Sequence, residues 1–176
     1  VTQRVFDTFL ISSIIGGGLG AGTGINNRTR KLMHERLMNP SLQQENLDAM
    51  EQINKLTLDN KDLNNQTINE NIENLNKKIS NNKAYNGVIV DSMDTDTQVK
   101  MAENASAISE ARIDLKNNFT TYDDSQKKAL KNVIKQKSDE NNRIWNDSAQ
   151  AWKQGQIDKI KQDIDKQVAA VENIDG

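Results

Sequence analysis

Few side chains in this sequence have the types and spacing that catalysis or metal binding would require. His34 is the single histidine and the chain has no cysteine, so neither a thiolate nucleophile nor the usual set of zinc ligands can be assembled. Asp91, Asp94 and Asp96 occupy relative positions 1, 4 and 6, which is typical of a solvated turn. A calcium loop instead places ligands at about positions 1, 3 and 5. We therefore expect no enzymatic activity, no catalytic residues, no metal and no cofactor.

A glycine-rich stretch at residues 16–21, GGGLGA, matches the loose G-x-G-x-x-A form of a dinucleotide-binding loop. It follows FLISSII, which could form a strand. That loop functions only within a set of parallel strands and helices, with an acidic residue about twenty positions further on. The chain supplies no second strand–helix unit, so we do not expect a nucleotide site.

The same glycines lie in the most apolar part of the chain, residues 9–25, which carries no charge. As a helix it would extend about 26 Å, just short of the roughly 30 Å hydrocarbon core of a bilayer. Glycines at four-residue spacing let two helix backbones approach closely in lipid. We expect this segment to insert into a membrane or to pack against neighbouring subunits through Phe9, Leu10, Ile14, Ile15, Gly16, Gly18, Gly20, Gly22 and Gly24. The alternatives to membrane insertion are a cleaved signal peptide and a flexible or subunit-packed tail.

The composition of the whole chain favours long polar helices over a thick core. Only 35% of residues are hydrophobic and 4% aromatic, and the mean hydropathy is -0.79. A single proline and few glycines after residue 25 leave too few breaks for many strands. The predicted class is all-α, with extended long helices or a helical hairpin, coiled-coil-like packing and a Gly-rich apolar N-terminal segment. The net charge of -2 argues against sequence-specific nucleic-acid binding.

The first half of the helical region is expected to break at Asn39 and Pro40, since proline disfavours helix at the residue before it. Ser41, with Gln44 three residues later, suits the start of a new helix over residues 42–80. Asn60 interrupts its apolar face, where it either fixes the register between helices or marks a wet, loosely packed surface. The residues expected to pack against other helices are Ile53, Leu56, Leu63, Ile68, Ile72, Leu75 and Ile79.

The second half begins after a predicted bend at residues 85–97, where Asn86 and Gly87 form a turn signal. Residues 101–122 show a heptad pattern that predicts packing along a partner helix. A new helix start is expected at residues 123–125, with an interruption at Gly155 and a short amphipathic stretch after it. Helix-packing positions are Ile108, Leu115, Phe119, Trp145 and Trp152. The predicted division is thus 1–27, 28–84, 85–97 and 98–176.

The order of these parts resembles the small internal virion proteins of short-tailed (podovirus) phages, which are ejected with the genome. Those proteins likewise open with a short apolar segment of small residues, here residues 9–25, and continue as polar helices rich in Gln and Asn. They also contain a central stretch with Gly, Ser and Met, comparable with residues 86–97, followed by a helix comparable with residues 101–122.

The resemblance implies storage in the virion interior and later formation of a channel through the host cell envelope, at the outer membrane. The implied partners are other copies of the chain in a ring or bundle, other core and portal proteins of the virion, and host membrane lipid. Two alternatives belong to other classes: a purely structural coiled-coil scaffold or virion assembly subunit without membrane activity, and a membrane-anchored bacterial secretion or surface factor.

Overall fold

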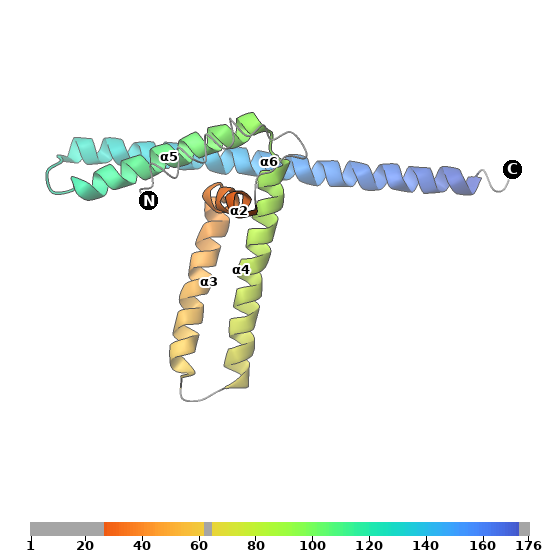
Figure 1. The fold of residues 1–176 in the computed structure, drawn as a ribbon, viewed down its shortest axis with the longest axis horizontal. Helices are drawn as coiled ribbons and strands as arrows, with labels where there is room; N and C mark the ends of the chain where they lie inside the picture. The colour runs from red at the N-terminus through yellow and green to blue at the C-terminus, as the bar shows by residue number, and fades with distance from the viewer. Residues whose placement is uncertain (1–26, 62–64, 173–176) are drawn as a thin grey trace.

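The computed structural model describes residues 27–61 and 65–172, and this part of the chain consists of helices joined by short links (Figure 1). The helices are α2 (Asn27–Arg36), α3 (Pro40–Asp59), α4 (Gln66–Ser92), α5 (Thr95–Asn117) and α6 (Asp124–Glu172). The predicted all-α class with close helix packing is confirmed. The Gly-rich segment at residues 9–25, with all of its predicted packing positions, lies outside the described residues.

The break between α2 and α3 occurs at the predicted place, but its cap is a different residue. The Asn39 Oδ1 accepts hydrogen bonds from the backbone N–H groups of Ser41, at 2.8 Å, and Leu42, at 3.3 Å. Pro40 occupies the first helical turn, where its missing N–H costs no hydrogen bond. Asn39, rather than Ser41, therefore caps the start of α3, because its side-chain amide reaches the free backbone N–H groups of the first turn.

A single helix over residues 42–80 is wrong, since α3 and α4 form an antiparallel hairpin (Figure 1). Asn60 ends α3: its Oδ1 accepts from the backbone N–H of Asn65 at 2.6 Å, and its Nδ2 donates to Asn69 Oδ1 at 2.8 Å. Asn65 in turn caps α4 by accepting from the backbone N–H of Ile68. Asn60, which interrupts the predicted apolar face, thus joins the end of α3 to the start of α4.

A connection does occur within residues 85–97, but no turn forms at Asn86 and Gly87, because α4 continues as a helix to Ser92. The link to α5 consists of Met93 and Asp94 alone. Asp94 caps α5 by accepting from the backbone N–H of Thr97 at 2.7 Å. Asn86 and Gly87 are buried inside the helix, so tertiary packing overrides the local tendency of this pair to turn.

The start of α6 follows the prediction, whereas the interruption at Gly155 does not occur. Asp123 and Gln126 form reciprocal side-chain to backbone hydrogen bonds of 2.8 and 3.0 Å, a capping box. From there α6 runs unbroken for 49 residues through Gly155. An exposed glycine costs a helix only about 1 kcal/mol, and the residues on both sides favour helix.

The core lies where α2, α4, α5 and α6 meet, near one end of the α3–α4 hairpin (Figure 1). α5 packs along α6, and α4 crosses α6 near the start of α5. The buried apolar side chains at this crossing are Met33, Leu37, Ile89, Val90, Met93, Met101, Ala102, Trp145 and Ala149. The core is small, and the C-terminal part of α6 extends well beyond it (Figure 1).

Candidate functional site

One buried amide, that of Asn86 on α4, joins four helical elements. Its Nδ2 donates to the His34 carbonyl oxygen at the end of α2 at 2.7 Å. Its Oδ1 accepts from the indole Nε1 of Trp145 on α6 at 2.9 Å, and from the backbone N–H of Asn39, the cap of α3, at 3.2 Å. Since Asn86 is 1% exposed, these hydrogen bonds satisfy its amide in place of bonds to water. Asn86 therefore fixes where α2, α3 and α6 meet α4.

Trp145 and Trp152, seven residues apart, lie on one face of α6, and this face packs on Tyr85 of α4 in the same chain. The Trp145 ring is 4% exposed and meets the Tyr85 ring edge to face, with centroids 5.6 Å apart. Trp152 is half-buried and lies 6.4 Å from the same ring. The position of Asn86, one residue after Tyr85, explains why the indole N–H finds a partner in this apolar contact.

Gly87 permits the close approach of α2 to α4. A Cβ atom at this position would lie 2.8 Å from His34 Nδ1, closer than unstrained atoms approach. On the other side of the ring, His34 Nε2 donates to Asp91 Oδ1 at 2.7 Å, and Arg30 forms an ion pair of 2.6 Å with Asp91 Oδ2. Partial burial acts to raise the pKa of Asp91, but the hydrogen bonds from Arg30 and His34 outweigh it and hold the pKa below its usual value.

The attachment of α2 should therefore weaken in acid. A carboxyl group whose pKa is lowered in the folded state adds stability above its ordinary pKa of about 3.9, and this stability is lost as the pH falls through the lower, folded value. We expect Asp91→Asn to be slightly less stable than the wild type at neutral pH. The free energies of unfolding of the two proteins should converge as the pH falls below about 4. Urea unfolding followed by helical circular dichroism at several pH values measures this. Asp147→Asn, at an exposed position of α6, is the control, and a wild-type advantage that persists at low pH would contradict the assignment.

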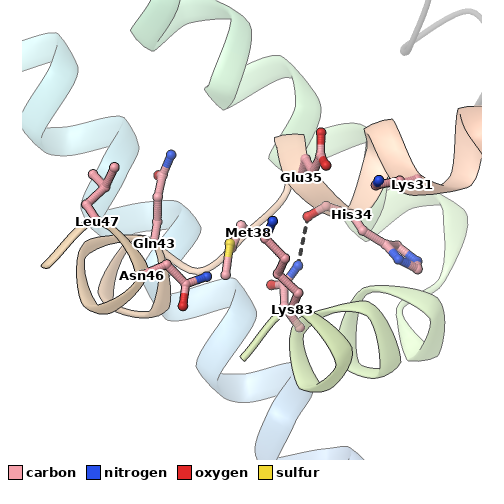
Figure 2. Close-up of a pocket in the computed structure, with 9 residues that line it drawn as sticks. Lys31, His34, Glu35, Met38, Gln43, Asn46, Leu47 and Lys83 are labelled. Atoms are coloured by element: carbon pink, nitrogen blue, oxygen red, sulfur yellow. Dashed lines mark hydrogen bonds between the residues drawn. The ribbon is translucent and has the colours of Figure 1, made fainter. Parts of the chain in front are cut away.

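A pocket with a volume of about 250 Å³ opens beside this junction, between α2, the start of α3 and α4 (Figure 2). The dashed line in Figure 2 marks the hydrogen bond from the Asn86 amide to the His34 carbonyl. The imidazole of His34 is oriented by the hydrogen bond from its Nε2 to Asp91. The lining residues are Lys31, His34, Glu35, Met38, Gln43, Asn46, Leu47, Lys83 and Asn86. The pocket thus combines opposite charges with exposed apolar carbon and has no defined chemical preference.

A second set of buried amides fixes α5 on α6. Asn104 Nδ2 donates to Asn141 Oδ1 at 2.9 Å, and Asn141 Nδ2 donates to the Met101 carbonyl oxygen at 3.1 Å. Gln98 Nε2 donates to the Val90 carbonyl oxygen at 2.8 Å, near the end of α4. Sequence reasoning missed these residues because Asn and Gln are abundant throughout the chain. For Gln98 and Asn104, their position on the same face of α5 as Met101 and Ala105 is the signal that could have found them.

The other predicted packing positions lie mainly at two helix–helix contacts within the chain, between α3 and α4 and between α5 and α6. Across the α3–α4 hairpin, Ile53, Leu56, Ile68, Ile72, Leu75 and Ile79 are all half-buried, and Leu63 lies outside the described residues. On α5, Ile108 and Leu115 are half-buried against α6, and Met101, Ala102, Ala105 and Ala111 are buried. Just after α5, Phe119 is 53% exposed. The Lys127 ammonium nitrogen lies over its ring, 4.6 Å from the ring centroid, in a cation–π contact.

Among the described residues, a row of exposed apolar side chains follows the part of α6 that projects from the core, residues 153–172, which we call the α6 arm (Figure 1). Five apolar side chains on the arm are between 46% and 60% exposed: Ile157, Ile160, Ile164, Val168 and Val171. At about 100° per residue they fall on one side of the helix, roughly a quarter-turn away from the face that Trp145 and Trp152 present to α4. The stripe lies on the part of α6 that projects beyond the core, and the core does not cover it.

Within residues 27–61 and 65–172, no cluster of His, Cys, Asp or Glu is grouped so as to hold a metal ion. None of the described helices has an apolar stretch long enough to span a bilayer. Comparison of the chain with protein-family models, curated proteins and solved structures gave no match.

Proposed function

We propose that this protein is a non-enzymatic helical assembly subunit, stored in the interior of a short-tailed phage virion and ejected to help form a channel through the host envelope. In this proposal the place where α2, α3, α4 and α6 meet around Asn86 is a rigid support. The α6 arm connects the subunit to other helices, and residues 9–25 enter the host membrane during delivery.

The observation that carries the assembly part of this proposal is the α6 arm. A helix that projects from its own core with five half-exposed apolar residues on one side needs a neighbour, because isolated amphipathic helices of this length are barely stable in water. Soluble monomers rarely keep such a continuous stripe uncovered.

The delivery part of the proposal rests on the sequence of residues 9–25. Gly16, Gly20 and Gly24 share one helical face, which suits backbone-to-backbone packing in lipid, while Phe9 and Ile14 supply apolar surface. The competing function is a structural scaffold or virion assembly subunit that never meets lipid. In a scaffold the same glycines would pack between protomers, so membrane activity separates the two functions.

Dye release from liposomes tests the proposal. The wild type should release an entrapped dye, and Gly20→Leu should reduce release to the level of a chain that starts at Asn26, because the added side chain separates the helix backbones. Gly20→Ala keeps a small residue and serves as the matched control, with release close to that of the wild type. Helix content by circular dichroism should be nearly the same for the wild type and the two Gly20 variants.

Two outcomes would contradict the membrane function. If the chain starting at Asn26 releases dye as well as the wild type, residues 9–25 are not the inserting segment. If none of the proteins releases dye from neutral or anionic liposomes, the structural scaffold replaces the channel-forming subunit.

A further inference from the structure

We infer that the α6 arm binds the α6 arm of a second copy of this chain, antiparallel to it, with the twofold axis at Ile164. This inference rests on the proposed assembly function and names the partner of its docking surface. Three features of the arm support it: the spacing of the stripe, the length of exposed helix, and the distribution of charge.

The apolar residues of the arm are spaced symmetrically about Ile164. The intervals from Ile157 through Ile160, Ile164 and Val168 to Val171 are three, four, four and three residues, and so read the same in both directions. Two antiparallel copies centred on Ile164 therefore place Ile157 level with Val171 of the other copy and Ile160 level with Val168. Every apolar residue of one stripe meets an apolar residue of the other.

The side chains also interdigitate in this arrangement. At about 100° per residue, Ile160 and Val168 lie roughly 40° to opposite sides of the direction of Ile164. A twofold axis through Ile164 brings Ile160 of one arm beside Val168 of the other without superposing them. Knobs of one helix can then fill the spaces of its neighbour, as helix packing requires.

The length of the exposed helix fits such a pair. With Ile164 at the centre, the end of α6 in one copy lies level with Gln156 of the other. Trp152 and Lys153 of α6 contact Tyr85 of α4, and residues 153–171 of α6 are all exposed. The two arms can therefore overlap over the whole apolar stretch from Ile157 to Val171, all of which lies beyond these contacts with Tyr85.

The charges of the arm permit self-association and favour the antiparallel orientation. Residues 153–172 contain four basic and four acidic residues, so two arms do not repel each other through net charge. Parallel, in-register arms would place every charged residue level with its own copy. In the antiparallel pair Lys161 lies level with Gln167, and only Asp163 and Asp165 bring like charges to one height. Opposed helix dipoles add a further small stabilisation.

The contact is expected to be weak. Five side chains on each arm bury less area than the roughly 1,200 Å² at which stable interfaces begin. The dimer should therefore form in a concentration-dependent way, and several subunits brought together in an assembly would raise its occupancy.

Disulfide cross-linking of the full chain tests both the pairing and its orientation, because the natural sequence has no cysteine. Under mild oxidation Ile164→Cys should form covalent dimers several-fold faster than Gln162→Cys, which lies on the opposite side of the arm. A mixture of Ile157→Cys and Val171→Cys should cross-link, whereas Ile157→Cys alone should not. In the antiparallel pair the two Ile157 positions lie about 21 Å apart, far beyond the reach of a disulfide. All four sites are exposed, so these variants should keep the wild-type helix content.

Each result has a single meaning. Equal cross-linking of Ile164→Cys and Gln162→Cys would overturn self-pairing through the stripe. Rapid dimer formation by Ile157→Cys alone would overturn the antiparallel orientation. Neither result would affect the dependence of dye release on Gly20, so a failure of this inference is distinguishable from a failure of the proposed function.

Discussion

Replacing Trp145 with alanine is expected to lower the free energy of unfolding by about 3–5 kcal/mol, the range for truncating a buried aromatic side chain. The ring is 4% exposed, packs edge to face on Tyr85, and lies within the small apolar core. The substitution also removes the indole donor from the Asn86 amide. A core of this size has few other contacts to compensate, so both urea unfolding and thermal unfolding by circular dichroism should show the loss.

Trp152→Ala is the matched control for this experiment. Trp152 meets the same tyrosine ring at a longer centroid distance of 6.4 Å, is only half-buried, and has no hydrogen bond with the Asn86 amide. Its loss of stability should be distinctly smaller than that of Trp145→Ala. Equal effects of the two substitutions would mean that Trp145 is not the contact that anchors α6 to α4.

Replacing Asn86 with leucine should be comparably damaging, although leucine is apolar and similar in size. The substitution leaves the Trp145 indole N–H, the Asn39 backbone N–H and the His34 carbonyl without their partner. Each unsatisfied buried polar group costs about 1–3 kcal/mol, so a loss of about 3 kcal/mol or more is expected. Because these groups belong to α6, α3 and α2, unfolding should also become less cooperative.

A double-mutant cycle with Trp145→Phe isolates the central hydrogen bond. Phenylalanine keeps most of the apolar packing and removes only the indole donor, so the two substitutions together should cost less than the sum of their separate effects. Asn81→Leu, at an exposed position of the same helix, controls for helix propensity and should change stability little. Strict additivity in the cycle would show that Asn86 and Trp145 do not act as a pair.

The sequence alone determined the features that depend on neighbouring residues. Pro40 cannot continue a helix with an intact hydrogen-bond pattern, and Asp123 with Gln126 satisfies the free donors at a helix start wherever the pair occurs. The apolar periodicities likewise predicted helices on both sides of these breaks. The stripe from Ile157 to Val171 was recognisable as amphipathic for the same reason, since its residues share one helical face by spacing alone.

Only the tertiary structure decided which helices meet and what the polar residues between them do. Asn60 and Asn65 have the same local tendencies as many other asparagines in this chain, and only their position between two half-buried faces makes them close a hairpin. Asn86 and Gly87 favour a turn in isolation, but in the folded chain they remain helical. The Asn86 amide gains partners on three other elements, and the missing Cβ of Gly87 admits His34. Such contacts join residues about 50–60 positions apart, so their free energy is absent from any local stretch of sequence and is realised only when the helices pack.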